Sequence, residues 1–191
     1  MRNLDKYKGV IPAFYACYDK DGNISPEAVQ ALTKYFVEKG VKGVYVNGSS
    51  GECIYQSVED RKIVLENVMK AAEGKLTVIA HVACNNTKDS QELAKHAESL
   101  GVDAIAAIPP IYFHLPEYAI AEYWNDISSA APNTDFVIYN IPQLAGVALT
   151  MYTDNVVNYS MATLSYPFGF YGMMLGLIKG KRYDFSCNTT V

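Results

Sequence analysis

Residues 76–108 read LTVIAHVACNNTKDSQELAKHAESLGVDAIAAI, and this stretch decides the fold. It begins with the apolar run Leu76–Val82 and ends with a second apolar run, Val102–Ile108. Between the two runs, Thr87–Leu100 is predicted to be a helix that stops at Gly101, a residue typical of helix C-termini. Two apolar strands joined through a helix predict a parallel sheet that is covered on both faces.

The same strand–helix unit repeats on both sides of this stretch. Further strands are predicted at Gly9–Tyr18, Gly43–Asn47 and Asp135–Asn140. Helices are predicted after the strands, and the first opens at Ser25-Pro26 with the serine as N-cap and the proline at the first helical position. The other helices are expected at residues 57–73 and 116–130. The strands begin roughly 30 residues apart, which is the length of one strand–helix unit.

Two α/β architectures fit this repeat, a (β/α)8 barrel of the TIM-barrel type and an open doubly wound sheet. No GxGxxG sequence follows the first strand, which weakens the dinucleotide-binding form of the open sheet. The chain has 191 residues, whereas a complete (β/α)8 barrel usually needs roughly 250. The repeat alone favours the barrel only slightly over the open sheet, and a barrel built from this chain would be incomplete, with about five strand–helix units.

Composition narrows the class of protein. The net charge is −4 and no basic stripe is present, so nucleic acid is not expected as a partner. Charged residues interrupt the N-terminus and no apolar stretch follows, so we expect no signal peptide and a cytoplasmic location. Four cysteines without CxxC spacing are interpreted as small buried side chains in a reduced compartment: Cys17, Cys53, Cys84 and Cys187.

The repeat fails after residue 154. No charged residue occurs from Asn155 to Ile178, and the stretch is rich in Tyr, Phe, Met and Gly. Its length would allow a membrane helix, but its polar residues, proline and glycines argue against one, so no membrane association is expected. We divide the chain into a barrel part, residues 1–154, and a poorly ordered tail, residues 155–191, that does not belong to it. A truncated, frameshifted or recombined end is our hypothesis for its origin.

The sequence GSSGE at residues 48–52 follows the second predicted strand. Catalytic groups of barrel enzymes lie on the loops at the carboxyl ends of the strands. Gly48 and Gly51 allow a close backbone approach, while Ser49 and Ser50 add hydroxyl donors, so a small carboxylate or phosphate would fit. A plain tight turn is the alternative interpretation.

Two tyrosines follow later strands. Tyr139 ends the fifth predicted strand and could relay a proton through its phenol, although a tyrosine that only caps the core is the alternative. Tyr112 follows two consecutive prolines, which stiffen its loop and present the ring outward. Taken alone, this loop indicates little more than a rigid turn.

The histidines have no spacing suited to a metal, and no HExxH, carboxylate cluster or P-loop occurs. We interpret His81 as a core or rim histidine and His96 as a residue on the solvent face of its helix. His114 is assigned no role. The sequence therefore predicts no metal site.

Three motifs in order resemble the N-acetylneuraminate lyase and dihydrodipicolinate synthase family of pyruvate-handling class I aldolases. GSSGE at 48–52 resembles the family's carboxylate-binding motif, and YNIP at 139–142 resembles its catalytic tyrosine motif. The loop at residues 108–113 resembles the one that carries a tyrosine near the active site. The resemblance runs from about Lys6 to about Thr150.

The family's dihydrodipicolinate synthases place an arginine where this chain has Leu144, which cannot supply the bidentate fork that holds a second carboxylate. Leu144 thus resembles the sialic acid lyase branch, which cleaves sialic acid to N-acetylmannosamine and pyruvate. Other branches act on other 2-keto-3-deoxy acids. The resemblance implies a homotetramer and no metal or organic cofactor.

The resemblance also implies roles for the motif residues. A lysine of the sixth strand forms a Schiff base with the keto carbon, and the resulting cation takes up electrons as the C–C bond breaks. Gly48, Ser49, Ser50 and Gly51 would hold the pyruvate carboxylate, with Tyr112 nearby. Tyr139 would move the proton of the sugar hydroxyl at the bond being cleaved.

The chain departs from the family at that lysine. No lysine or arginine lies between Lys95 and Lys179, and Lys179 is more than one unit beyond Tyr139 with an approach that is not strand-like. We interpret Lys179 as a solvated tail residue rather than the nucleophile. We expect impaired lyase activity and a tendency to aggregate, because an unclosed barrel leaves unpaired strand edges. A non-catalytic carboxylate-binding remnant or regulatory subunit of the family, and an aldolase for another 2-keto-3-deoxy acid, remain open.

Overall fold

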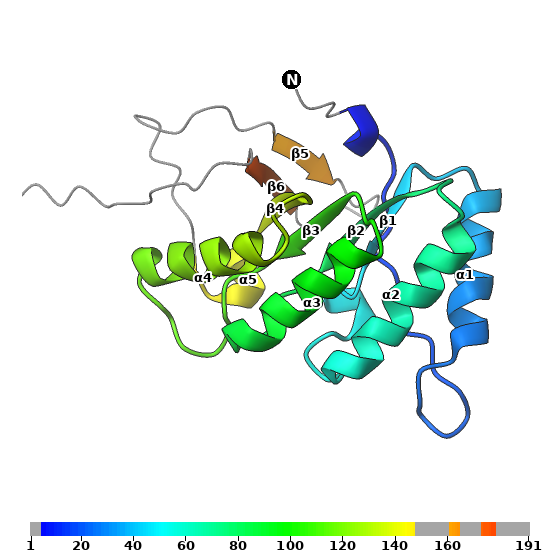
Figure 1. Cartoon of the computed structure of the whole chain (residues 1–191), viewed down its shortest axis with the longest axis horizontal. Coiled ribbons are helices and arrows are strands. Elements are labelled where there is room, and N and C mark those ends of the chain that lie inside the picture. The colour runs from blue at the N-terminus through cyan, green and yellow to red at the C-terminus, as the bar shows by residue number, and fades with distance from the viewer. Residues whose placement is uncertain (1–4, 148–160, 165–172, 179–191) are drawn as a thin grey trace, which may run out of the picture.

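The computed structural model describes residues 5–147, 161–164 and 173–178 (Figure 1). Four parallel strands form its centre: β1 (Gly43–Val46), β2 (Thr77–His81), β3 (Ala104–Ala107) and β4 (Asp135–Asn140). They lie side by side in chain order. Every residue of the first three strands is buried, as the continuous apolar runs predicted.

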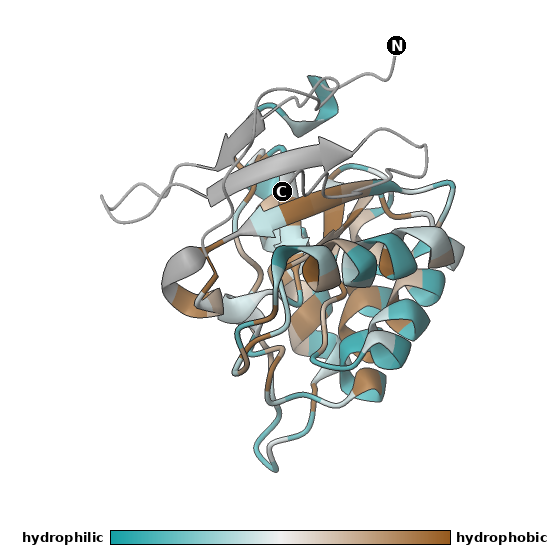
Figure 2. Ribbon diagram, turned by 90° about the vertical axis from the view of Figure 1, so that its left-hand side faces the viewer, coloured by the Kyte–Doolittle hydropathy of each residue, from teal (hydrophilic) through white to brown (hydrophobic). Residues whose placement is uncertain are grey.

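The long helices alternate with these strands: α1 (Pro26–Glu38), α2 (Val58–Ala72), α3 (Thr87–Ser99) and α4 (Glu117–Ala130). They lie next to one another along one face of the sheet (Figure 1). Hydrophilic residues cover the outer sides of these helices, whereas the strands behind them are largely hydrophobic (Figure 2). A doubly wound sheet would carry helices on both faces, so this arrangement is the wall of a (β/α) barrel and the fold class is confirmed.

Local capping sets the helix starts. The Ala28 amide donates to Ser25 Oγ (3.2 Å), and Pro26 takes the first helical position, as predicted. At α2, the Asp60 amide donates to Ser57 Oγ and the Ser57 amide donates to the Asp60 carboxylate, which completes a capping box.

The predicted first strand, Gly9–Tyr18, is wrong as a regular strand. The segment runs parallel to β1 at a single bridge, where the Phe14 amide donates to Tyr45 O (2.8 Å) and the Tyr45 amide donates to Pro12 O (2.9 Å). Pro12 has no N–H to extend the ladder. The segment covers the β1 edge as an extended chain.

Two further strands, β5 (Met161–Leu164) and β6 (Met173–Ile178), fall within the predicted tail. β6 pairs antiparallel with β4, with Phe136 opposite Ile178 and Asn140 opposite Met174, and β5 pairs antiparallel with β6. The prediction that the approach to Lys179 is not strand-like is therefore wrong. The pairing covers β4, and the described sheet remains open with β1 and β5 as its edge strands. An apolar run beside an open edge can pair in either direction, and this one pairs against the direction of a barrel strand.

The chain start closes the amino ends of the strands. Tyr7 is the last residue of the short helix η1 (Asp5–Tyr7), and its hydroxyl is 2.8 Å from both Asp103 O and Asp135 Oδ2. Lys6 Nζ lies 3.2 Å from Asp135 Oδ2. These contacts tie the start of the chain to the start of β3 and of β4, the end of a barrel associated with stability rather than catalysis.

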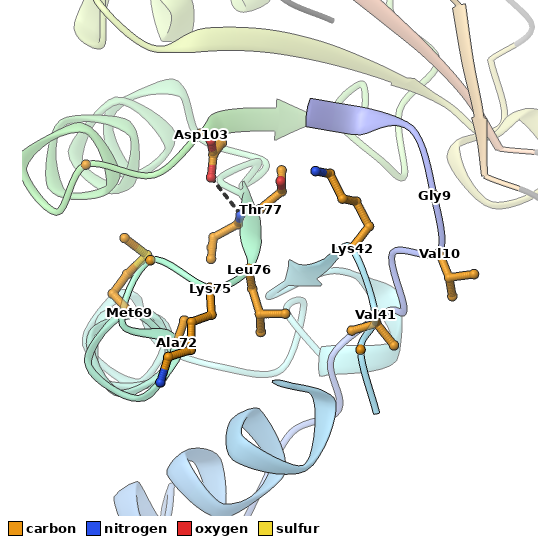
Figure 3. Close-up of a pocket in the computed structure, with 14 residues that line it drawn as sticks. Gly9, Val10, Val41, Lys42, Met69, Ala72, Lys75, Leu76, Thr77 and Asp103 are labelled. Atoms are coloured by element: carbon orange, nitrogen blue, oxygen red, sulfur yellow. Dashed lines mark hydrogen bonds between the residues drawn. The ribbon is translucent and has the colours of Figure 1, made fainter. Parts of the chain in front are cut away.

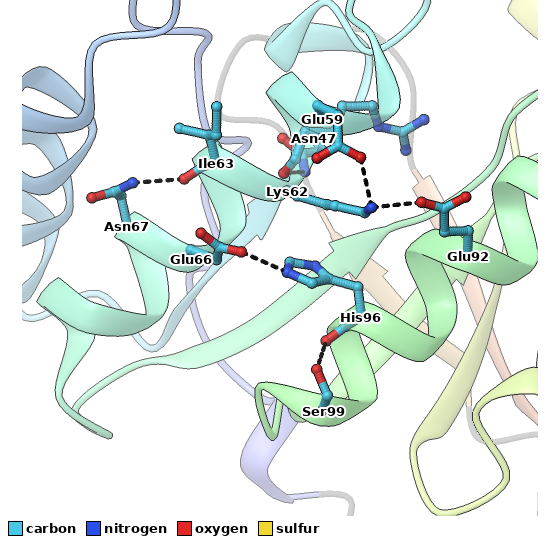
Figure 4. A network of polar contacts seen from close by, with 10 residues as sticks. Asn47, Glu59, Lys62, Ile63, Glu66, Asn67, Glu92, His96 and Ser99 are labelled. Atoms are coloured by element: carbon cyan, nitrogen blue, oxygen red, sulfur yellow. Dashed lines mark hydrogen bonds and ion pairs between the residues drawn. The ribbon is translucent and has the colours of Figure 1, made fainter.

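Ion pairs join the outer sides of α2 and α3 (Figure 4). Lys62 bridges Glu59 on its own helix and Glu92 on α3, and His96 Nε2 lies 2.8 Å from Glu66 Oε1. The His96 side chain is half-buried between the helices, so its predicted place on the solvent face is corrected. It lies there because adjacent helices cover each other's flanks.

Candidate functional site at the carboxyl ends of the strands

The GSSGE turn lies where β1 ends. Asn47 takes a left-handed conformation (φ 58°), and Ser49–Gly51 then form a single helical turn, η2. The Gly51 amide donates to Gly48 O (2.9 Å), whereas the amides of Ser49 and Ser50 have no acceptor among the described residues. Two backbone donors are thus available to a ligand, next to an exposed Ser49 side chain and a half-buried Ser50.

Close packing leaves little room for a side chain at either glycine of the turn. A Cβ atom at Gly48 would lie 2.6 Å from Cε1 of Tyr45, and one at Gly51 would lie 3.1 Å from Phe14 O. The turn therefore lies directly against β1 and the extended segment beside it. A larger residue at position 48 would displace the Tyr45 ring.

Tyr139 reaches the same place from β4. Its side chain is buried, and its ring meets that of Tyr45 edge-on, with centroids 5.7 Å apart and planes at 81°. The Tyr45 ring also lies 6.0 Å from the His81 ring. The structure thus brings Tyr139 and the Gly48 turn together through Tyr45, a residue that the sequence analysis did not select.

The Tyr45 hydroxyl is buried and has no hydrogen-bond partner among the described residues. Burial, with a further contribution from Tyr139, raises the pKa of Tyr45 well above its usual value. The hydroxyl therefore stays protonated and can donate to a bound acceptor. A tyrosine in an otherwise apolar strand, three residues before a glycine turn, was the available signal.

A second missed residue, Arg61, lies under this end of the sheet. Its guanidinium donates to His81 O (2.7 Å, from Nη2) and Ala83 O (3.0 Å, from Nη1). Its backbone carbonyl accepts from Asn47 Nδ2 (2.8 Å), and Asn47 O lies 3.0 Å from His81 Nδ1. Arg61 lies on the apolar stripe of α2, and a cation at such a position is the feature of the sequence that could have indicated a buried charge.

His81 is buried and hydrogen-bonded, so its interpretation as a core histidine is confirmed. Burial, and then the nearby Arg61 charge, lower the pKa of His81 to about 3. The imidazole is therefore neutral at physiological pH. It ties β2 to the Asn47 turn instead of carrying a charge.

Tyr112 presents its ring outward, as predicted. The side chain is 85% exposed, and its ring packs against Phe113 with centroids 4.8 Å apart. The Ile111 amide donates to Asn85 Oδ1 (2.9 Å), which anchors the loop to the end of the β2 unit. Among the described aromatic contacts, the Tyr112 ring meets Phe113 and not the Tyr45–Tyr139 pair.

Lys179 lies outside the described residues. β6 ends one residue before it and runs toward the amino end of β4, since Ile178 pairs with Phe136 and Met174 pairs with Asn140. Tyr139 and the Gly48 turn are at the other end of the sheet. Leu144, the residue that indicated the lyase branch, is exposed just after the short helix α5 (Pro142–Ala145) begins.

Three of the four cysteines are described, and all three are free thiols. Cys53 is buried, whereas Cys17 and Cys84 are half-buried, and burial raises the pKa of each thiol. Cys187 lies outside the described residues. No cluster of metal-ligating side chains occurs in the described part of the chain. None of the helices in that part has the length and apolar character needed to cross a bilayer.

A cavity of about 630 Å³ opens at the other end of the strands (Figure 3). Lys42, Thr77 and Asp103 lie at its wall, each within one residue of the start of a strand. This hollow is at the amino ends of β1 to β3, away from Ser49 and Tyr139. It does not belong to the candidate site.

Comparison with known proteins places these features in a family. Residues 6–159 match the model of the dihydrodipicolinate synthetase family. The N-acetylneuraminate lyase of Mediterraneibacter gnavus is 93% identical over 150 residues, which are 78% of this chain and 48% of that protein. The chain spans about half the length of the curated relatives it matches.

Solved structures agree with this assignment. The wild-type Ruminococcus gnavus sialic acid aldolase matches with a TM-score of 0.75 and 93% identity, covering 76% of this chain and 48% of that one. The Mycoplasma synoviae N-acetylneuraminate lyase matches with a TM-score of 0.70 and 38% identity, covering 74% and 49%. With its parallel strands, its one-sided helices and the match over residues 6–159, the chain belongs to the dihydrodipicolinate synthetase family.

Proposed function

We propose that the chain supplies the carboxylate-binding and proton-transferring half of an N-acetylneuraminate lyase, a class I aldolase that cleaves sialic acid to N-acetylmannosamine and pyruvate. One observation carries the proposal. The Tyr45 ring packs against both the position of Gly48 and the ring of Tyr139, which supports a shared site for the turn and the phenol at the carboxyl ends of the strands. The high identity to a protein named for that activity supports the choice of substrate.

The geometry suits the roles in the following way. The amides and hydroxyls of Ser49 and Ser50, with Gly48 and Gly51 allowing a close approach, would hold the carboxylate of a 2-oxo acid. The Tyr139 phenol would carry the proton to and from the sugar hydroxyl at the bond being cleaved. Both groups act without a metal ion or organic cofactor in this proposal.

The Schiff-base lysine is the part this chain does not supply in the expected place. We propose that Lys179 does not take that role, because β6 runs toward the amino end of β4, away from Tyr139. The chain alone would then have little or no lyase activity. The absence of lysine and arginine between Lys95 and Lys179 favours a second candidate function, a non-catalytic module that binds 2-oxo acids.

Trapping with borohydride tests both candidates. The purified chain is incubated with pyruvate and sodium borohydride, and its intact mass and modified peptides are measured beside a full-length relative. We expect no adduct on this chain and full labelling of the relative. An adduct on Lys179 would show that this lysine can act as the nucleophile. The non-catalytic module requires instead that pyruvate shift the NMR signals of the Ser49 and Ser50 amides without forming an adduct. A chain that neither reacts nor binds would contradict both.

We also propose that residues 155–191 are an addition to the barrel rather than its continuation. The family match ends at residue 159, and β6 pairs antiparallel where the next barrel strand would run parallel. The barrel part is accordingly residues 1–154. Deletion of residues 155–191 tests this, because an addition can be removed with the Tyr139 ring signals retained, although β4 then regains an open edge.

For the whole protein we propose a cytoplasmic location and a homotetramer, as the family resemblance implies. This chain spans about half of its relatives, so some of the surfaces for assembly would lie elsewhere. We expect size exclusion of the chain alone to show a species other than a tetramer. A sharp tetramer peak would contradict that expectation.

A further inference from the structure

Arg61 is a buried cation without a carboxylate partner. Only 1% of the residue is exposed, and its guanidinium contacts two backbone carbonyls and, at 3.1 Å, the sulfur of Cys84. Among the residues that the structure describes, no carboxylate pairs with it. A charge left in the interior without a counter-charge is strongly unfavourable, so a chain that keeps one there calls for a physical explanation.

The contacts of Arg61 fix its place at the carboxyl ends of two strands. Its two donor nitrogens hold the carbonyls of His81, the last residue of β2, and of Ala83 just beyond. Its own carbonyl holds the side chain of Asn47, the residue directly before the Gly48 turn. A single residue therefore connects the end of β2, through its side chain, to the turn that follows β1, through its backbone carbonyl.

Further unused donors lie at this end of the sheet. The Tyr45 hydroxyl and the Nε of Arg61 are both buried without a partner among the described residues. The amides of Ser49 and Ser50 also have no acceptor there. Buried donors are normally satisfied, so two unpaired ones at the same end of the sheet as the free turn amides and a positive charge are complementary to an anion with more than one acceptor oxygen. The Arg61 charge already acts on this region, where it contributes to the low pKa of His81.

We propose that Arg61 is the positioning residue and internal counter-charge of the carboxylate site: its guanidinium fixes the carbonyl of His81, whose ring contacts Asn47 O, and its charge favours an anion at the Ser49 and Ser50 amides. This deepens the proposed function and rests on it. The ligand class is a 2-oxo carboxylate. A neutral ligand of the same shape, in which an amide replaces the carboxylate, would bind to the same positioned turn but would not be attracted by the charge of Arg61.

Paired ligands on the full chain separate charge from structure. Pyruvate and its neutral analogue pyruvamide are titrated while the Ser49 and Ser50 amide signals are followed by NMR. We expect Arg61→Met to weaken pyruvate binding by about tenfold and to leave pyruvamide binding nearly unchanged. Arg61→Lys, which keeps the charge but loses the two-pronged contact, should retain most of the preference for pyruvate.

A core variant on the same helix controls for loss of stability. Val68 is fully buried on α2 and takes part in none of the hydrogen bonds of Arg61, so Val68→Ala should lower the thermal midpoint without changing the ratio of the two affinities. If Arg61→Met does not fold, Arg61→Gln removes the same charge and keeps a donor for the His81 carbonyl.

The outcomes distinguish the two proposals. If the unaltered chain binds pyruvate and Arg61→Met weakens pyruvate and pyruvamide equally, or neither, the counter-charge role is overturned while the proposed function stands. If pyruvate gives no shift but acetate shifts the same amides in an Arg61-dependent way, the counter-charge role of Arg61 holds, whereas the 2-oxo ligand class and the proposed function fail. No response to either anion overturns both.

Discussion

The ring of Tyr45 meets the ring of Tyr139 edge-on at a centroid distance of 5.7 Å, although their strands, β1 and β4, are separated by β2 and β3. In a flat sheet, strands three positions apart would be about 14 Å from each other. The contact shows that the sheet is strongly curved and that both rings lie on its concave side. The curvature of the sheet therefore both begins to form a barrel interior and brings the strand that carries the Gly48 turn close to the strand that carries Tyr139.

Removing the Tyr45 hydroxyl should not destabilise the chain. Tyr45→Phe deletes a buried donor that has no partner, so we expect a free energy of unfolding that is unchanged or higher by up to about 1 kcal/mol. Tyr45→Ala, which also removes the ring beneath Tyr139, should cost about 3–5 kcal/mol. Urea unfolding measures both. A loss of more than 1 kcal/mol in Tyr45→Phe would reveal a partner for the hydroxyl.

Gly48 should not tolerate even one added carbon. In Gly48→Ala the new Cβ would meet Cε1 of Tyr45 at 2.6 Å, so the ring must move and disturb its contact with Tyr139. We expect a destabilisation of about 1–3 kcal/mol and shifted ring signals of Tyr139 by NMR. Ser49→Ala, on the exposed side of the same turn, is the matched control and should stay within about 0.5 kcal/mol. Equal effects of the two changes would argue against this packing.

Acid should destabilise the fold through His81. The pKa of this histidine is about 3 in the folded chain and near 6.5 when unfolded, so between these values only the unfolded chain holds the extra proton. Stability is therefore fully present above about pH 6.5 and falls with decreasing pH, by as much as about 1.4 kcal/mol per pH unit from this group.

Comparison with His81→Asn isolates that contribution. Asparagine keeps a donor for Asn47 O but does not titrate, so its unfolding free energy should fall less steeply between pH 6.5 and 5 than that of the unaltered chain. Carboxylates titrate in both proteins and cancel in the difference. Parallel pH profiles would mean that His81 is already able to take up a proton in the folded state.

The sequence predicted most of the barrel wall because its signals are local. The capping residues Ser25 and Ser57 and the apolar run at β4 each act within a few residues, and the structure confirms all three. The extended segment at Gly9–Tyr18 was harder, because whether such a segment forms a ladder depends on Pro12 and on the neighbouring edge.

The site was predicted only in part, for a different reason. Glycine turns and strand-end tyrosines are visible in sequence, whereas the contact of Tyr45 with Tyr139 depends on curvature across four strands. Arg61 could not be selected from the sequence because its hydrogen bonds are made with residues at the ends of two other elements, β1 and β2. The pairing of β6 likewise depends on a long-range choice of direction that no local pattern contains.

The amino end of the barrel should depend on Tyr7 more than on the exposed charges beside it. Tyr7→Phe removes the hydroxyl that lies 2.8 Å from both the Asp103 carbonyl oxygen and Asp135 Oδ2, and it leaves the buried Asp135 carboxylate with one donor fewer. We expect a loss of about 1–3 kcal/mol in the free energy of unfolding. Lys8→Ala breaks only the exposed pair with Asp5 and should change the free energy of unfolding by less than about 1 kcal/mol.

Hydrogen exchange adds a local readout, since Tyr7→Phe should expose the first amides of β3 and β4 while those of α1 keep their protection. Similar losses in the two variants, or faster exchange confined to α1, would show that the start of the chain is not what holds these strand ends together.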